Sequence, residues 1–228
     1  MYDNVVLIPY RNRKTHLDYF INNTVPLFEK WLPNTKVVVV EQTGSKLFNR
    51  GVVLNVGFKE YQNKTKYFIT HDVDLNPTQK AIQDFYTNDV TTKEVLGIWT
   101  PACNTLGGII KIRNEDIHTI NGFPNDIWGW GAEDKALQNR AEFYDMKKIT
   151  NLINDKEHPE YILRFNDVND RNKSNYSKYY KEHYLDFLKK NNEQKEKLIL
   201  NSGLNNLKYD VIKKISLHPC VELILVDI

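Results

Sequence analysis

The densest group of chemically active side chains lies between residues 122 and 140, which read GFPNDIWGWGAEDKALQNR. Trp128 and Trp130 alternate with glycines, and Glu133 and Asp134 follow almost at once. Flat aromatic rings suit the apolar faces of sugars, and a nearby carboxylate can accept a proton from an attacking hydroxyl. Ordinary charge in the first turn of a helix explains the acids but not the tryptophans. We expect the helix dipole to keep both acids ionised.

A second acidic pair, Asp72 and Asp74, ends an apolar run within HDVDLNP. Side chains two residues apart on a strand share a face, so both carboxylates can meet one divalent cation that bridges a diphosphate. An isolated D-x-D more often marks a solvated strand end. Here Arg11, Arg13 and Arg50 also follow predicted buried strands, and guanidinium groups suit phosphates. Together these residues predict nucleoside-diphosphate binding at one sheet edge.

Apolar patterning supplies the elements that would position these residues. Buried strands are predicted within 4–13, 36–42 and 66–75, with helices at 15–31 and 48–63 between them. This alternation is typical of a doubly wound α/β sheet. Downstream we predict strands near 94–102, 106–113 and 160–170, helices at 114–122 (capped by Asn114), 133–144 and 172–201, and a terminal antiparallel hairpin within 207–228.

The bulk composition fits one packed domain. The 228 residues are 41% apolar and carry a net charge of +2, which gives no reason to expect a nucleic-acid partner. Two cysteines, Cys103 and Cys220, exclude a disulfide-rich scaffold and leave a single bridge between them open. No apolar run approaches the ~20 residues of a membrane span. We therefore expect a soluble, cytoplasmic chain, or a Golgi-luminal one if the sequence comes from a longer protein.

Six segments carry a resemblance to a known family: PYRNR, FNRGVVLNVGF, HDVDLNP, LGGIIKI, INGFPNDIWGWGAED and GLNNLKYDV. Their order and approximate spacing are similar to those of the β-1,4-galactosyltransferase family over nearly the whole chain. HDVDL and the terminal PCVELILVD most resemble the xylosylprotein galactosyltransferase branch. The resemblance implies a GT-A fold, which is a Rossmann-like mixed α/β sheet flanked by helices, here with a C-terminal antiparallel hairpin.

The resemblance also implies an activity, an inverting metal-dependent transfer of a hexose from a UDP-sugar to a saccharide or glycoside. Residues 1–228 would form one catalytic domain, with 1–100 mainly binding the nucleotide and 101–228 mainly binding the acceptor and completing the metal site. Asp134 would be the general base and Glu133 its catalytic neighbour. The donor site would comprise Pro9, Tyr10, Arg11, Arg13, Phe48, Arg50, Asp72, Val73 and Trp130. The sugar pocket would comprise Thr105, Gly108, Trp130 and Glu133.

The metal site departs from the family pattern. Mn²⁺ is the usual metal, but the expected histidine is missing from RFNDVNDR at 164–171. We expect Asp74, Asp167 and Asn169 to supply oxygen ligands, which suit Mn²⁺ or Mg²⁺. For His158, a more distant alternative ligand, a surface or structural role is favoured.

Two further departures affect the substrate. Lys135 follows Asp134, where the acidic run normally continues. Thr105 stands where a tyrosine usually narrows the donor pocket, so UDP-N-acetylhexosamine competes with UDP-galactose as the donor. A non-catalytic sugar or nucleotide binder and a nucleotidyltransferase stay open as other classes. The intact acids Asp74, Glu133 and Asp134 argue against the first, and the tryptophans have no evident use in the second.

Overall fold

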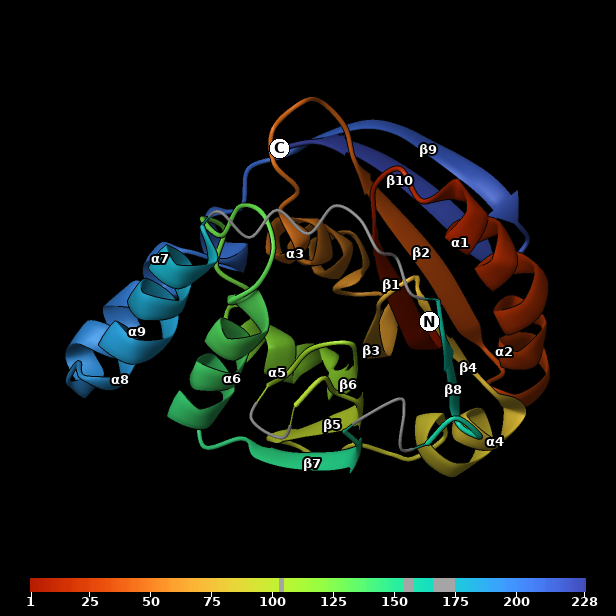
Figure 1. The fold of residues 1–228 in the computed structure, drawn as a ribbon, viewed down its shortest axis with the longest axis horizontal. Coiled ribbons are helices and arrows are strands. Elements are labelled where there is room, and N and C mark those ends of the chain that lie inside the picture. The colour runs from red at the N-terminus through yellow and green to blue at the C-terminus, as the bar shows by residue number, and fades with distance from the viewer. Residues whose placement is uncertain (103–104, 154–157, 166–174) are drawn as a thin grey trace.

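The computed structural model describes residues 1–102, 105–153, 158–165 and 175–228. Its centre is a sheet of eight strands in the order β7-β5-β6-β3-β1-β2-β10-β9 (Figure 1). The strands are β1 (Tyr2–Tyr10), β2 (Thr35–Gln42), β3 (Thr65–His71), β5 (Glu94–Trp99), β6 (Ile109–Arg113), β7 (Lys147–Leu152), β9 (Asp210–His218) and β10 (Val221–Asp227). A separate pair joins β4 (Leu75–Pro77) to β8 (Ile162–Arg164).

Parallel and antiparallel pairs are mixed within the large sheet. The pairs β1/β2, β1/β3, β2/β10 and β5/β7 are parallel. The pairs β3/β6, β5/β6 and β9/β10 are antiparallel. The predicted mixed α/β sheet and the predicted C-terminal hairpin are therefore both confirmed.

Helices cover both faces of the sheet, so two cores form. One core packs α1 (Lys14–Tyr19), the π-helical turn η1 (Phe20–Thr24), α2 (Val25–Trp31), α4 (Gln79–Ala81) and the turn η2 (Ile82–Tyr86) on one face. The other packs α3 (Arg50–Tyr61), α5 (Asn114–Thr119) and α6 (Glu133–Phe143) on the opposite face. Strands between two layers need apolar residues on both sides, which explains why residues 4–10 of β1 are buried without alternation.

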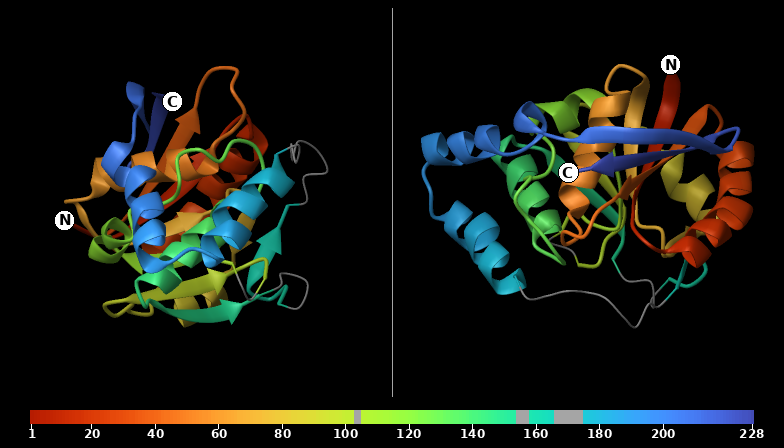
Figure 2. Two further views of the ribbon diagram at one scale, coloured as in Figure 1. Left: turned by 90° about the vertical axis from the view of Figure 1, so that its left-hand side faces the viewer. Right: turned by 90° about the horizontal axis from the view of Figure 1, so that it is seen from above.

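A third group of helices lies beyond α6 and projects from the body of the molecule (Figure 2). It comprises α7 (Tyr176–Tyr180), the π-helical turn η3 (Lys181–Leu185), α8 (Asp186–Leu188), α9 (Asn192–Asn201) and the short 3₁₀ turn η4 (Leu204–Asn206). One tie to α6 is the Asn139 side chain, which donates to the His183 carbonyl at 2.9 Å.

The glycines of α3 are a packing requirement rather than a weakness. A Cβ at Gly57 would lie 2.7 Å from Leu7 Cδ2 of β1. Glycine therefore lets the helix approach the central strand closely, and the gain in packing outweighs its poor helix propensity. This contact joins the middle of α3 to the middle of β1.

Several sequence predictions differ from the structure in detail. The single helix predicted over 172–201 is wrong, because α8 ends at Leu188 and α9 begins anew after Asn191, whose side chain caps Gln194 N at 2.9 Å. Asn114 does not cap α5 but begins it, and its side chain donates to the Thr65 carbonyl instead. β7 was not predicted, since only two of the six residues in its sequence KKITNL are apolar. Residues 166–170 of the predicted strand at 160–170 lie outside the described residues.

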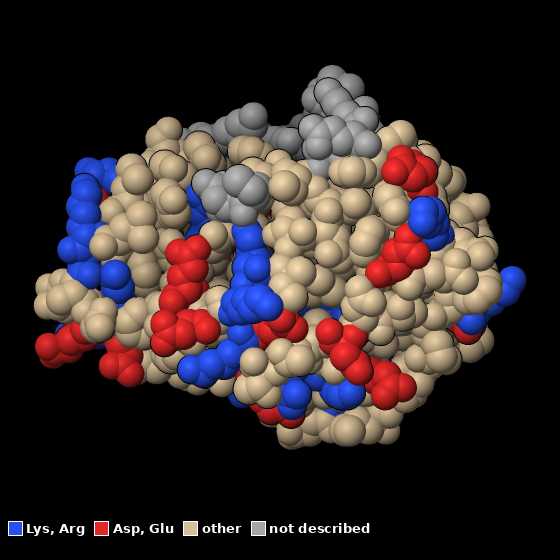
Figure 3. Space-filling model, turned by 90° about the horizontal axis from the view of Figure 1, so that it is seen from below, with Lys and Arg blue, Asp and Glu red and all other residues tan. Residues whose placement is uncertain are grey.

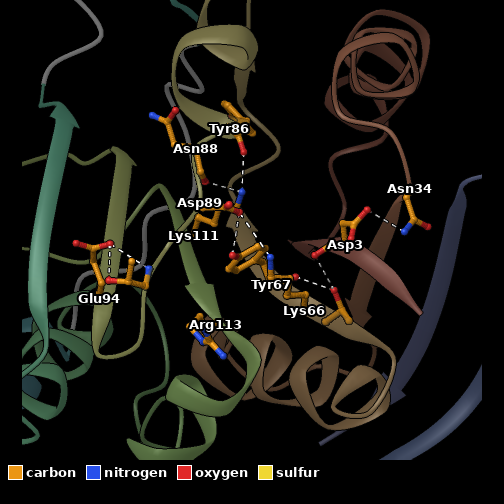
Figure 4. Close-up of polar contacts among 12 residues, drawn as sticks. Asp3, Asn34, Lys66, Tyr67, Tyr86, Asn88, Asp89, Glu94, Lys111 and Arg113 are labelled. Carbon is orange, nitrogen blue, oxygen red and sulfur yellow. Dashed lines mark hydrogen bonds and ion pairs between the residues drawn. The ribbon is translucent and has the colours of Figure 1, made fainter.

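A buried lysine ties η2 and the loop after it to the sheet (Figure 4). Lys111 of β6 donates to the carbonyls of Tyr86 and Asn88, both at 2.8 Å, and its ammonium lies 4.5 Å from the Tyr67 ring centroid. Burial lowers the pKa of Lys111 to about 8, although the charge of Asp89 opposes this shift. With two carbonyls and a ring to satisfy it, Lys111 has a structural role.

Basic and acidic side chains are interspersed on the face seen from below (Figure 3). That face therefore presents no extended patch of one sign. Within the described residues, no helix has both the length and the apolar character needed to cross a membrane.

Candidate active site

A cleft of about 920 Å³ opens where β1 and β3 end and α3 and α6 begin. Ligands of open α/β sheets bind at this kind of edge. Almost all of the predicted site residues that the structure describes line it. They are Pro9, Arg11, Arg13, Phe48, Arg50, Asp72, Val73, Asp74, Thr105, Gly108, Trp130, Glu133 and Asp134.

Tyr10 is the exception among the described residues. Its ring is buried in the core beneath α1 and α2 rather than in the cleft lining. Asp167 and Asn169, the predicted metal ligands, lie outside the described residues. His158 does not line the cleft but lies beside Glu160 and Tyr161, which agrees with the surface role favoured for it.

Arg50, the first residue of α3, is the centre of the site. Its Nε and Nη2 donate to Asp72 Oδ1 at 2.9 and 2.8 Å, and its Nη1 donates to Asp134 Oδ1 at 2.9 Å. Glu133 Oε1 lies 3.9 Å from Nη1. One guanidinium thus links the end of β3 to the first turn of α6. Arg50 is predicted to contact the donor, but in this geometry it orients the acids.

The two acids at the start of α6, Glu133 and Asp134, have raised pKa values. Burial raises the pKa of Asp134 well above its ordinary value, Arg50 opposes this, and the charges of Glu133 and Asp72 add to it. Burial likewise raises the pKa of Glu133 against the pull of Arg50. The sequence suggested that the helix dipole would keep Glu133 and Asp134 ionised. In the structure three carboxylates face one guanidinium, so burial and mutual repulsion raise the pKa values of both acids in spite of the dipole.

The same charges act on Arg50 itself. Burial favours the neutral guanidine, but the carboxylates of Asp72, Asp134 and Glu133 outweigh burial and raise the pKa of Arg50. Its positive charge is therefore permanent in the cleft.

The position of the Asp134 carboxylate also requires a glycine at residue 107. A Cβ at Gly107 would lie 1.9 Å from Asp134 Oδ2, and Leu106 N donates to the Asp134 carbonyl at 3.3 Å. Gly108, the next residue, has a φ of +73°, and a Cβ there would lie 2.4 Å from the Trp99 ring. The Gly-Gly pair therefore lets the chain pass between Trp99 and the acid.

The tryptophan loop is anchored at both ends. Gly129 N donates to the Phe48 carbonyl at 2.8 Å, and Ala132 enters α6 with a left-handed φ of 78°. Trp130 is 39% exposed, and its ring centroid lies 5.7 Å from that of Tyr176. Glycines on either side of Trp130 would suggest a freely moving ring, but Gly131 is packed, because a Cβ there would lie 2.7 Å from the Tyr176 ring.

Arg11 lines the cleft and also holds one of its walls, while its predicted contact with the donor stays a prediction. Its two terminal nitrogens donate to the carbonyls of Lys46 and Gly44 at 2.5 and 2.8 Å. These bonds fix the loop between β2 and α3, which forms one wall of the cleft. Arg13 also lines the cleft, and its charge acts on Asp74.

Asp74 is buried and has a guanidinium close by. Arg164 Nε lies 3.8 Å from Asp74 Oδ2, and Phe165 N donates to the Asp74 carbonyl at 2.9 Å. Phe165 packs edge-on against Tyr19 at 4.5 Å between centroids. A hard cation fits the Asp74 carboxylate, and the described residues near it include the carboxylate of Asp72 as well as Arg164 and Phe165. Completion of a metal site would depend on side chains from 166–174, outside the described residues.

Sequence reasoning missed several residues that line the cleft, among them Trp99, Tyr176, Lys46 and Arg164. Trp99 lies three residues before the end of the strand predicted near 94–102, so its position near a strand end was an available signal. Tyr176 is 46 residues from Trp130, and no local pattern links the two.

Comparison with known proteins identifies this arrangement. A family model described as the N-terminal region of glycosyl transferase group 7 matches residues 1–87, and one described as the N-terminal domain of galactosyltransferase matches residues 92–168. The chain belongs to the β-1,4-galactosyltransferase family. The two models together cover every described residue of the cleft except Tyr176.

Curated members of the β-1,4-galactosyltransferase family are similar over the same region. β-1,4-Galactosyltransferase 4 of Rattus norvegicus is 37% identical over 150 residues, covering 62% of this chain and 43% of the relative. β-1,4-Galactosyltransferase 1 of Homo sapiens is 35% identical over 147 residues, covering 62% of this chain and 37% of the relative. The matches thus span less than half the length of these relatives.

Solved structures confirm the GT-A fold. A mutant β-1,4-galactosyltransferase 7 of Drosophila, in complex with manganese, UDP-Gal and xylobiose, aligns with a TM-score of 0.75 at 22% identity over 100% of this chain and 94% of that one. A mannosyltransferase of Pyrobaculum calidifontis, in complex with GDP-Man and Mn²⁺, aligns with a TM-score of 0.53 at 13% identity over 67% of this chain and 56% of that one.

Proposed function

We propose that this chain is an inverting glycosyltransferase that moves a hexose, galactose by family default, from a UDP-sugar to a saccharide or glycoside hydroxyl. The observation that carries the proposal is the meeting of Arg50, Asp72, Glu133 and Asp134 in one cleft beneath Trp130. Acids, arginines and a sugar-sized aromatic surface in the same cavity serve glycosyl transfer better than nucleotide binding alone.

Asp134 is the general base in this proposal. The acceptor oxygen attacks the anomeric carbon, its proton passes to the Asp134 carboxylate, and the bond from the anomeric carbon to the UDP oxygen breaks on the opposite face, which inverts the configuration. The hydrogen bond from Arg50 Nη1 fixes the orientation of that carboxylate. The raised pKa of Asp134 brings it nearer to the working pH, which improves a general base.

Glu133 orients the acceptor in this proposal. Its Oε2 is buried and has no hydrogen-bond partner within the described part of the chain, so it can accept a bond from a sugar hydroxyl. Trp130 and Tyr176 form the adjoining aromatic surface for the sugar faces. Xylobiose occurs in the Drosophila complex, and we propose an acceptor of the same saccharide class and membership of the xylosylprotein branch.

The donor half of the site comes from the end of β1, the start of α3 and the acidic pair after β3. We propose that residues 1–100 mainly bind the nucleotide, through Pro9, Arg13, Phe48 and the Asp72–Asp74 segment. Asp74 would hold Mn²⁺, with Mg²⁺ as the alternative, together with Asp167 and Asn169. When bound, the cation supplies positive charge to the diphosphate. Both solved complexes described above contain manganese.

The size of residue 105 affects which donor sugar fits the pocket, and Thr105 supports a second candidate for the donor. Thr105 lines the cleft, and its hydroxyl donates to the Ala102 carbonyl at 3.1 Å. A side chain of this size leaves room that a tyrosine would fill, so UDP-N-acetylhexosamine is the competing donor.

UDP release measured with UDP-galactose and UDP-N-acetylhexosamine against a small panel of xylosides and oligosaccharides tests the proposal. Asp134→Asn should lower turnover roughly 10²–10⁴-fold, the usual weight of general-base catalysis, and leave the affinity for UDP nearly unchanged. The matched control is Asp145→Asn, which follows the same helix at a left-handed φ of 56° that asparagine also adopts.

Three outcomes would count against the proposal. UDP binding without release for any donor would make the chain a non-catalytic binder. Full turnover in Asp134→Asn combined with none in Glu133→Gln would exchange the two roles. An acid limb of kcat/KM at or below the ordinary aspartate pKa of 3.8 would contradict the raised pKa of the base.

A further inference from the structure

A group of metal-ligating side chains lies at the other end of the sheet from the cleft. Cys220 immediately precedes β10, and its carbonyl accepts from Val37 N at 2.8 Å, near the start of β2. The cleft residues instead follow the ends of β1 and β3. The turn of the β9–β10 hairpin lies beside the α1–α2 helical segment in both views (Figures 1 and 2).

Three different ligand types meet at this turn. His218 ends β9, Cys220 follows one residue after Pro219, and Glu29 reaches across from α2. One potential ligand atom of each lies within 4.8 Å of the others. Elsewhere in the described residues, no other three His, Cys, Asp or Glu side chains gather this closely.

The spacing of these atoms is close to that of a tetrahedral metal site. His218 Nδ1 lies 3.3 Å from Cys220 Sγ and 3.9 Å from Glu29 Oε1. Ordinary Zn–S, Zn–N and Zn–O bonds at tetrahedral angles separate sulfur from nitrogen by about 3.6 Å and nitrogen from oxygen by about 3.4 Å. Shifts of roughly half an ångström therefore suffice, and rotation of the exposed Glu29 side chain can supply them.

The δ-nitrogen of His218 faces the cysteine. His218 Nδ1 lies 3.3 Å from Cys220 Sγ and 3.5 Å from Cys220 N. The two strands on either side of the turn hold His218 and Cys220 in fixed relation. This arrangement needs little ordering before a cation binds.

We propose that Glu29, His218 and Cys220 bind a borderline-soft divalent cation, Zn²⁺ in the first place, and that the ion clips the C-terminal hairpin to α2. Sulfur, imidazole and one carboxylate suit Zn²⁺ and disfavour Mg²⁺ or Ca²⁺, which prefer oxygen. Three protein ligands leave a fourth position for water. The site is separate from the active site and does not depend on the proposed function.

The charges facing this site act in both directions. The negative charge of Glu29 attracts a cation, whereas the positive charge of Lys36 repels one. The Lys36 ammonium donates to the Pro219 carbonyl at 3.4 Å. Burial raises the pKa of the Cys220 thiol, and the charge and hydrogen bond of Glu29 raise it further, against Lys36.

Cobalt titration of the reduced, metal-free full chain tests the proposal, because a thiolate ligand gives Co²⁺ a near-ultraviolet charge-transfer band. We expect this band at one equivalent of Co²⁺, abolished by excess Zn²⁺ and unaffected by excess Mg²⁺. Cys220→Ser should remove the band, and His218→Gln or Glu29→Gln should weaken affinity roughly tenfold or more, since each loses one ligand. Cys103→Ser, which changes the other cysteine, is the matched control and should keep the band.

A band that persists in Cys220→Ser, or that disappears only in Cys103→Ser, would overturn the assignment. Absence of any band in the wild-type chain at millimolar Co²⁺ would do the same. If Cys220→Ser fails to fold, Glu29→Gln decides the matter, because this exposed helix position tolerates the change. Equal Co²⁺ affinity in Glu29→Gln and in the wild type would remove the carboxylate from the site.

Discussion

Arg50→Met would remove the guanidinium that holds the cleft acids together while keeping most of the apolar stem. The lost contacts are those to Asp72, Asp134 and Glu133 at 2.8, 2.9 and 3.9 Å. Breaking a buried ion pair from one side typically costs about 3–5 kcal/mol. Because the side chains of Asp72 and Asp134 keep 32% and 24% exposure, water can partly resolvate them, and we expect the lower end, about 3 kcal/mol at pH 8.

The loss should depend on pH in a definite direction. Without Arg50, Glu133 and Asp134 lose the positive charge that opposes the rise of their pKa values, so these pKa values rise further and the two acids take up protons more readily. Protonation removes the repulsion that destabilises the variant. The difference in unfolding free energy between wild type and Arg50→Met should therefore shrink as the pH falls from 8 to 5.

Urea denaturation followed by tryptophan fluorescence at both pH values measures this difference. Arg113→Met is the matched control, because Arg113 lies away from the cleft and pairs with the exposed Glu115 at 3.2 Å (Figure 4 labels Arg113). That control should change stability by less than about 1 kcal/mol. Equal destabilisation of the two variants at pH 8, or a loss in Arg50→Met that is as large at pH 5 as at pH 8, would refute the reasoning.

Three other predictions follow from the geometry. Thr105→Tyr should lower kcat/KM for UDP-N-acetylhexosamine relative to UDP-galactose by roughly 10-fold or more, measured by UDP release, and an equal effect on both donors would place Thr105 outside the donor pocket. Asp74→Ala should abolish the Mn²⁺-dependent part of UDP binding in calorimetry, and unchanged affinity would remove Asp74 from the metal site. Burial lowers the pKa of His71 to about 4 from 6.5, so the unfolded chain takes up the proton first and stability should fall between pH 6.5 and 4, by up to about 3 kcal/mol. His71→Gln should flatten that pH dependence of the urea midpoint, and an unchanged slope would contradict the buried neutral imidazole.

The sheet and the helices around the cleft could be predicted because each has a strong local signal. Continuous apolar runs mark β1, β2 and β3, and a helix starting at Glu133 agrees with the predicted bounds to within one residue. The place of Asp72, Asp74 and Arg50 follows from the same reasoning, since residues after parallel strands meet at one edge. Local patterns therefore placed Asp72, Asp74 and Arg50 at the cleft, but they did not find Trp99, Tyr176, Lys46 or Arg164.

What each of these residues contacts could not be predicted, because the contacts join distant parts of the chain. Arg50 and Asp134 are 84 residues apart, and only the packing of α3 and α6 on the same face of the sheet brings them together. Arg11 binds two loop carbonyls rather than lying free for a phosphate. A guanidinium has several donors, and its sequence position does not specify which acceptors the fold will provide.

The role of the glycines around the active site also could not be predicted from the sequence, because it depends on contacts with distant residues. A glycine beside a functional aromatic residue suggests freedom of movement, yet Gly131 is required because the Tyr176 ring lies where its side chain would be. Gly107 leaves space for the Asp134 carboxylate, whose nearest oxygen would be 1.9 Å from an added Cβ. A methyl group at position 107 would have to displace Asp134 from Arg50, the contact that orients the proposed base. The position of the Asp134 carboxylate therefore depends on the absence of a side chain at Gly107 as well as on its hydrogen bond with Arg50.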